Sequence, residues 1–195
     1  MTEFHKTAVL GAGVIGASWA ALFLASGREV AVYDASPDAE EKVRAFVKNA
    51  WQTMDDLGLV ADQNSNRLRF FKTPGEAVEG ASFIQESVPE RLAIKYALYS
   101  EIEPHLSPDA IVATSASGLM LSEMQVGWKN PGRFVLGHPF NPPHLIPLVE
   151  IMDNERTDAG VVDAADRFYT GIGKITIRVR REVLALLQGI SVEPR

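Results

Sequence analysis

Short apolar runs alternate along the chain with longer stretches in which apolar residues recur at helical spacing. Such alternation is typical of βαβ units, in which helices cover both faces of a parallel sheet. The pattern predicts about eight strands, at 7–10, 30–34, 68–71, 82–86, 111–114, 134–137, 148–152 and 175–178. It predicts helices at 14–26, 37–57, 91–102 and 158–169. We therefore expect one doubly wound α/β domain with a mostly parallel sheet.

Composition and charge exclude several classes of protein. Hydrophobic residues make up 46% and charged residues 23% of the chain, as in ordinary globular proteins. The formal net charge of −6 argues against nucleic-acid or anionic-membrane partners, and the chain has no cysteine for a disulfide or thiolate site. There is neither a signal-peptide pattern nor an apolar run long enough to span a membrane. We expect a cytoplasmic protein.

The turn between the first expected strand and helix fits the pattern G-x-G-x-x-G, with glycines at Gly11, Gly13 and Gly16 and with Val14 and Ile15 opening the helix. The first glycine permits a tight turn, the second lets the backbone approach a pyrophosphate, and the third lets helix and strand pack closely. The helix N-terminus then faces the phosphates. A strand before and a helix after support a Rossmann-type dinucleotide site. The glycines alone also fit an FAD site or a purely structural turn.

Asp34 ends the second expected strand, 18 residues beyond the last glycine of the turn. A carboxylate there can accept hydrogen bonds from both hydroxyls of an adenosine ribose and would repel a 2′-phosphate. No arginine follows until Arg44. The cofactor we expect is therefore NAD rather than NADP, unless Asp34 is merely solvated.

A proline-rich segment follows the sixth expected strand and reads Gly-His-Pro-Phe-Asn-Pro-Pro-His from Gly137 to His144. It places His138 at the carboxyl edge of the sheet, where open α/β sheets bind ligands. Glu150 lies on the next strand, so a carboxylate–imidazole pair forms if the loop doubles back. From spacing alone, a structural histidine and a surface glutamate fit as well. The two histidines are six residues apart with prolines between them and no evident third ligand, so we expect no metal site.

The segment HPFNPPHLIPLVE, together with the glycine turn and Asp34, resembles the NAD-dependent 3-hydroxyacyl-CoA dehydrogenase family over about residues 6–183. Within that family, the stretches Ser18-Trp19-Ala20, Phe83-Ile84-Gln85-Glu86 and Val88-Pro89-Glu90 are similar to the branch of λ-crystallin/L-gulonate dehydrogenase and L-carnitine dehydrogenase.

The resemblance implies roles for individual residues. It implies that His138 is the catalytic acid/base, that Glu150 orients it, and that Ser117 hydrogen-bonds the reacting oxygen near the nicotinamide. It implies that Glu90 and Lys95 lie near the cofactor and substrate. Without the resemblance, Ser117 also fits a helix cap, and Glu90 with Lys95 a solvated helix face.

The same resemblance implies hydride transfer between NAD and C3 of a 3-hydroxyacyl-CoA or a small 3-hydroxy acid. An acyl-CoA substrate would place the protein in fatty acid metabolism. Two alternatives stay open: an L-carnitine or L-gulonate 3-dehydrogenase, and a non-catalytic NAD-binding remnant or crystallin-like protein.

The resemblance ends near Val183. Family members continue with a Pro-Gly-Phe-like turn, a helix carrying an Asn-Arg pair and a mostly helical domain, none of which residues 184–195 match. We expect residues 1–183 to form the NAD-binding domain and 184–195 a divergent tail in place of the helical domain. Such a truncated chain would be weakly active alone, and would self-associate or take the helical domain from a separate chain.

Overall fold

A computed structural model of the protein describes residues 4–62 and 65–180. The expected tail at 184–195, and its boundary at 183, lie outside the described residues. The strands are β1 (Lys6–Leu10), β2 (Glu29–Tyr33), β3 (Leu68–Phe70), β4 (Phe83–Glu86), β5 (Ile111–Thr114), β6 (Phe134–Pro139), β7 (Leu148–Met152) and β8 (Ile175–Val179). The helices are α1 (Val14–Ala25), α2 (Ala39–Asp56), α3 (Pro74–Val78), α4 (Leu92–Ile102), α5 (Leu121–Met124) and α6 (Val161–Thr170).

The strands of the described residues form one eight-stranded sheet in the order β3-β2-β1-β4-β5-β6-β7-β8. Strands β1 to β6 are parallel, β7 runs antiparallel to β6, and β8 is parallel to β7. The strand order reverses between β1 and β4, and ligands of open α/β sheets bind outside the carboxyl ends of strands at such a reversal. The predicted doubly wound, mostly parallel sheet is confirmed.

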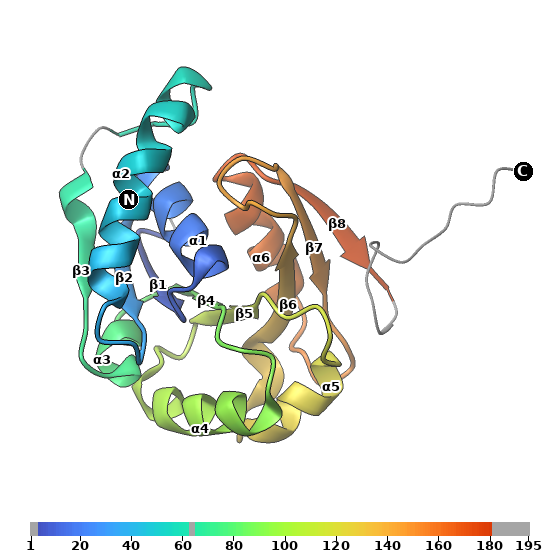
Figure 1. Ribbon diagram of the computed structural model, residues 1–195. Helices are drawn as coiled ribbons and strands as arrows, with labels where there is room; N and C mark the ends of the chain where they lie inside the picture. Colours follow the sequence, from blue (N-terminus) through green and yellow to red (C-terminus); the bar gives the residue numbers. More distant parts are fainter. Residues whose placement is uncertain (1–3, 63–64, 181–195) are drawn as a thin grey trace, which may run out of the picture.

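Helices cover both faces of the sheet (Figure 1). One core cluster lies under α1, α2 and α6 and is rich in aromatic residues, including Trp19, Phe23 and Phe168. Within it the rings of Phe83 and Phe168 stack at 3.6 Å between centroids. The other cluster lies under α3, α4 and α5 and contains Tyr99. Side chains of each buried strand therefore alternate between two apolar layers.

Two short helices were missing from the prediction. α3 is five residues long, and its N-terminus is a capping box in which Thr73 and Glu76 bond each other's backbone, with Pro74 in the first turn. α5 is four residues long. Elements this short carry too few residues for a periodic apolar pattern. The capping box was the readable signal for α3.

The outer strand β8 is the least covered part of the sheet. Ile175 and Ile177 are 62% and 37% exposed, although both are large apolar side chains. Opposite them on the strand, Thr176 contacts Asp166 of α6. Among the helices that the structure describes, none combines the length and apolar character needed to cross a membrane.

Candidate active site

The glycine turn joins β1 to α1 at the carboxyl edge of the sheet. Gly11 has φ +85°, and a Cβ on it would lie 2.7 Å from the backbone of Ser87 and Val88. A Cβ on Gly16 would lie 1.8 Å from the Gly11 carbonyl oxygen. A Cβ on Gly13 would meet no heavy atom of the described residues within 4 Å. Two glycines are therefore required by packing, and the third leaves open space above the turn.

The N-terminus of α1 is open to a ligand. Gly13 is its N-cap and makes no side-chain hydrogen bond, and the first turn contains no acidic residue. Val14, the first helical residue, is 74% exposed, and Ile15 is half-buried. The first backbone N–H groups of a helix lack internal partners and attract anions. This turn therefore fits the pyrophosphate of a dinucleotide.

Asp34 lies directly beside the turn, at the carboxyl end of β2. Its Oδ2 accepts a hydrogen bond from the Ala12 N–H at 2.6 Å, and its Oδ1 accepts one from the Ser36 N–H at 2.8 Å. The half-buried carboxylate is thus held in place, and each oxygen keeps a further lone pair for a ribose hydroxyl.

A cavity of about 540 Å³ contains Gly11, Gly13 and Asp34. The structure thus brings three of the predicted cofactor residues to one cavity wall. The cavity extends from the turn to one face of α4, and the residues that complete its lining are Tyr33, Ala35, Pro74, Ser87, Val88, Pro89, Ile94, Ala97, Leu98 and Glu101. Its position at the strand-order reversal is the one expected for a nucleotide.

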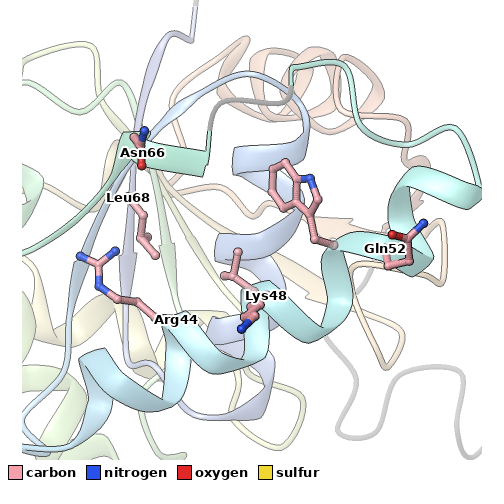
Figure 2. A pocket seen from close by; sticks show the side chains of 7 residues that line it. Arg44, Lys48, Gln52, Asn66 and Leu68 are labelled. Carbon is pink, nitrogen blue, oxygen red and sulfur yellow. The ribbon is translucent and has the colours of Figure 1, made fainter.

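A second hollow, of about 470 Å³, lies between α2 and the start of β3. Figure 2 shows Arg44, Lys48 and Gln52 along α2, with Asn66 and Leu68 across the hollow. It contains none of the predicted site residues. The cavity at the glycine turn is therefore the one of the two that fits a dinucleotide.

His138 and Glu150 face each other across the hairpin of β6 and β7. They are register partners in the antiparallel pairing, and His138 Nδ1 lies 3.1 Å from Glu150 Oε2. Glu150 is fully buried and His138 is 6% exposed. Glu150 Oε1 has no hydrogen-bond partner among the described residues. The loop doubles back as the prediction required, so the pair exists; its catalytic role stays a prediction.

The loop between β6 and β7 is held by buried polar contacts that the sequence did not reveal. The Oγ of Ser18, on α1, accepts the main-chain N–H of His144 at 2.9 Å and lies 2.7 Å from His144 Nδ1. Burial, and then the charge of Lys174, lower the pKa of the His144 imidazole. His144 therefore acts as a neutral structural group that ties the loop to α1.

Lys174, just before β8, holds the other side of this loop. Its Nζ donates to the carbonyl oxygens of Pro143 and Ile146, the latter at 2.7 Å, and lies 5.2 Å from the Trp19 ring centroid. The residue is 6% exposed, and burial lowers the pKa of its ammonium group to about 8. Lys174 thus holds the loop that follows His138. Among the described contacts, it has no carboxylate partner.

Ser117 lies in the exposed loop after β5, next to the strand that carries His138. Its backbone N–H and its hydroxyl both donate to Glu90 Oε1, at 2.7 and 3.1 Å, and the Gly118 N–H donates to Oε2 at 3.0 Å. Burial alone would raise the pKa of the Glu90 carboxyl, but these hydrogen bonds bring it below its ordinary value. Glu90 is therefore an ionised clamp on the Ser117 loop.

Lys95 is not part of a solvated helix face. It is fully buried, and its Nζ donates to both carboxylate oxygens of Glu86 at 2.7 Å. Tyr99 and Thr114 donate to the same carboxylate. Glu90 precedes α4 and Lys95 lies on the buried side of that helix, and the charge of Lys95 contributes to the lowered pKa of the Glu90 carboxyl. The role of the two residues near cofactor and substrate stays a prediction. Lys95 ties α4 to β4 and β5.

A second buried network connects α1, the sheet and α6. Tyr169 donates to Gln85 Oε1 at 2.6 Å, and Gln85 Nε2 donates to Ser115 Oγ at 2.8 Å. Trp19 and Ser87 also contact that hydroxyl. Ser115, rather than Ser117, is therefore the buried serine of this loop. Trp19 and Gln85 belong to two of the stretches on which the resemblance to one branch of the dehydrogenase family was based.

Among the described residues, no cluster of three or more His, Asp or Glu side chains could hold a metal ion. This edge of the sheet carries the His138–Glu150 pair, the glycine turn and Asp34.

Comparison with known proteins agrees with this arrangement. A family model described as "3-hydroxyacyl-CoA dehydrogenase, NAD binding domain" matches residues 6–183. The L-carnitine dehydrogenase of Nocardiopsis dassonvillei is 46% identical over 191 residues, covering 94% of this chain and 58% of that protein. The L-carnitine dehydrogenase of Pseudomonas putida is 44% identical over 183 residues, covering 94% and 57%. The chain thus spans less than two thirds of the length of these relatives.

Solved structures with the same fold include a 5-formyl-3-hydroxy-2-methylpyridine 4-carboxylic acid 5-dehydrogenase, described as an NAD⁺-dependent dismutase. It is 31% identical with a TM-score of 0.88, and the match covers 95% of this chain and 60% of that one. The 3-hydroxybutyryl-CoA dehydrogenase of Escherichia coli is 25% identical with a TM-score of 0.83, covering 91% and 38%.

Proposed function

This chain belongs to the 3-hydroxyacyl-CoA dehydrogenase family, and we propose that it oxidises the 3-hydroxyl of a small 3-hydroxy acid, with L-carnitine as the first candidate. The cofactor is NAD. The observation that carries the reaction type is the buried His138–Glu150 pair, 3.1 Å apart, at the carboxyl edge that also carries the glycine turn.

The contact between the two side chains determines which imidazole nitrogen is available. Glu150 is an acceptor when ionised, so Nδ1 of His138 carries the proton that bridges them and Nε2 is left as a base. Nε2 takes the proton of the substrate hydroxyl, and Glu150 stabilises the imidazolium that forms. NAD, when bound, supplies the acceptor for the hydride that leaves C3. In reverse, the imidazolium returns the proton to the ketone.

Ser117 is assigned to the reacting oxygen. Its hydroxyl has a single proton, which is directed at Glu90 Oε1. To donate to the substrate oxygen, the hydroxyl must therefore rotate away from Glu90. The two backbone N–H groups that bind Glu90 keep the loop in place during that rotation. The Ser117 hydroxyl thus donates to Glu90 before substrate binds and to the substrate oxygen afterwards.

The relatives favour L-carnitine over an acyl-CoA. L-carnitine dehydrogenases are 40–46% identical to this chain, whereas the 3-hydroxybutyryl-CoA dehydrogenase of Escherichia coli is 25% identical. A 3-hydroxyacyl-CoA is the second candidate, because the family takes its name from that substrate.

The substrate is tested in a chimera in which this chain replaces the matching N-terminal part of the Pseudomonas putida relative. NADH formation is followed with L-carnitine and with 3-hydroxybutyryl-CoA, and the unmodified relative is the positive control. We expect L-carnitine to be oxidised much faster than the acyl-CoA. Preference for the acyl-CoA would reverse the substrate assignment, and no turnover of either by a chimera that binds NADH would refute the reaction type.

We propose in addition that the β8 edge associates with further polypeptide. Its support is the exposure of Ile175 and Ile177 on an outer strand, since unpaired apolar edges favour association. The 195-residue chain alone would then self-associate and turn over substrate poorly. Analytical ultracentrifugation and the same assay test this, and a monomeric, fully active chain would contradict it.

A further inference from the structure

The cofactor cavity has a second carboxylate besides Asp34. α4 contributes Ile94, Ala97, Leu98 and Glu101 to the cavity wall. These positions are three, four and seven residues apart, so they share one helix face. Ile94 is 38% exposed. The face is therefore an apolar wall that ends in a carboxylate.

The opposite wall is formed at the end of β2 and the start of α3. It contains Tyr33, Asp34, Ala35 and Pro74. Burial raises the pKa of the Tyr33 phenol, and the charges of Glu101 and then Asp34 raise it further. Both carboxylates thus lie close to the same ring, one from each wall.

The chemistry of NAD distinguishes these two acids. Asp34 is fixed by two backbone N–H groups beside the glycine turn, where it meets the ribose diol. The same cavity is lined by Ala35 and by the apolar face of α4, so a base attached to that ribose would have room between them. Adenine carries one exocyclic amine, a donor, and a carboxylate is an acceptor only. Glu101 makes no hydrogen bond or ion pair with the other described residues, so its oxygens are available.

We propose that Glu101 recognises the adenine base by accepting a hydrogen bond from its N6 amino group. The cavity then selects for an adenine dinucleotide against one whose base has a carbonyl oxygen at that position, because two acceptors would face each other there. Glu101 is a specificity-determining residue for the cofactor, and the assignment rests on NAD binding and not on the identity of the substrate.

The test compares NADH with reduced nicotinamide hypoxanthine dinucleotide, in whose base a carbonyl oxygen replaces the amino group and N1 carries a hydrogen. Dissociation constants are measured with the full chain by calorimetry or NADH fluorescence. We expect NADH to bind roughly ten- to a hundredfold more tightly, as for one charge-assisted hydrogen bond. Equal affinities in the unaltered chain would overturn the proposal, and no variant is needed for that result.

Variants then locate the effect. Glu101→Gln should reduce the preference to about threefold or less, because an amide can accept from adenine or donate to hypoxanthine. The matched control is Glu155→Gln, which removes the same charge from an exposed position on the loop between β7 and α6 and should keep the full preference. A Glu101→Gln chain that discriminates as well as the unaltered one would overturn the assignment. Binding of neither dinucleotide would overturn it together with the cofactor assignment.

Discussion

The glycine turn and the β6–β7 hairpin differ in the groups that they contribute to the site. At the strand-order reversal, the site is made of backbone: the turn from Gly11 to Gly16 and the N–H groups that fix Asp34. At the β6–β7 hairpin it is made of buried side chains, with His138 on Glu150 and Lys174 on the following loop. In the proposed reaction, the first part binds the cofactor through its shape and backbone dipoles, and the second part transfers a proton.

This difference affects how each part depends on the rest of the molecule. The geometry of the glycine turn depends mainly on the few residues that join β1 to α1 and on the packing of that helix on that strand. The hairpin is held by contacts between residues far apart in the chain, such as Ser18 with His144, 126 positions away. Substitutions in the glycine turn should therefore weaken cofactor binding, whereas substitutions in the hairpin should lower turnover without affecting cofactor binding.

The largest expected effect is on turnover. His138→Ala in the chimera with the Pseudomonas putida relative should lower kcat by roughly 10²- to 10⁴-fold, the usual contribution of a general base. Its affinity for NADH should stay the same. His5→Ala, at an exposed histidine beside Glu29, is the matched control and should leave kcat unchanged. A His138 variant that keeps its turnover would remove the acid/base assignment.

A pair of glycine substitutions separates packing from binding within the turn. Gly16→Ala places a Cβ 1.8 Å from the Gly11 carbonyl oxygen and should destabilise the fold by about 3 kcal/mol. Gly13→Ala meets no atom of the described residues within 4 Å and should unfold at nearly the urea concentration of the unaltered chain. Equal stability of the two variants would contradict the close packing of α1 on β1.

Asp34→Ala should change both the affinity for NADH and the preference for NADH over NADPH. Loss of hydrogen bonds to a charged acceptor should weaken NADH binding by roughly 1–3 kcal/mol. NADPH should gain relative to NADH, because no carboxylate then opposes its 2′-phosphate. Calorimetric titration with both cofactors measures this. Equal affinity of the unaltered chain for NADH and NADPH would refute the role given to Asp34.

Lys174 predicts a pH dependence of the hairpin part. Burial lowers its pKa to about 8 in the folded chain, below the 10.5 of an ordinary lysine, so the unfolded chain binds more protons between these values. The free energy of unfolding should therefore rise by about 2–3 kcal/mol from pH 8 to 10.5, relative to Lys174→Met. Urea denaturation of both proteins across that range measures the difference. A constant difference would show that Lys174 titrates alike in both states.

The sequence predicted what local patterns determine. All eight strands were predicted within a few residues, because buried parallel strands are continuous apolar runs. The His138–Glu150 contact was predicted on the condition that the loop between their strands doubles back, which it does. The glycine turn was predicted from its spacing together with the strand before it and the helix after it.

The features that the sequence did not predict are contacts between residues far apart in the chain. Lys95 was taken together with Glu90 from the family resemblance, whereas the fold shows that its hydrogen-bond partner Glu86 lies on a strand under the helix. Ser18 was noted only as part of a stretch that resembles relatives, and Lys174 was not noted at all, because each binds a loop that only the fold brings near. α3 was the exception, because its capping box was present in the sequence.

One titration tests the division of the site most directly. NADH is titrated by fluorescence into the full chain, into His138→Ala and into Gly13→Ala. The account predicts that the first two bind equally and that Gly13→Ala binds at least about tenfold more weakly, because its methyl group occupies the approach to the pyrophosphate. A His138→Ala chain that loses NADH as completely as Gly13→Ala would contradict it, since the hairpin would then be part of the cofactor site.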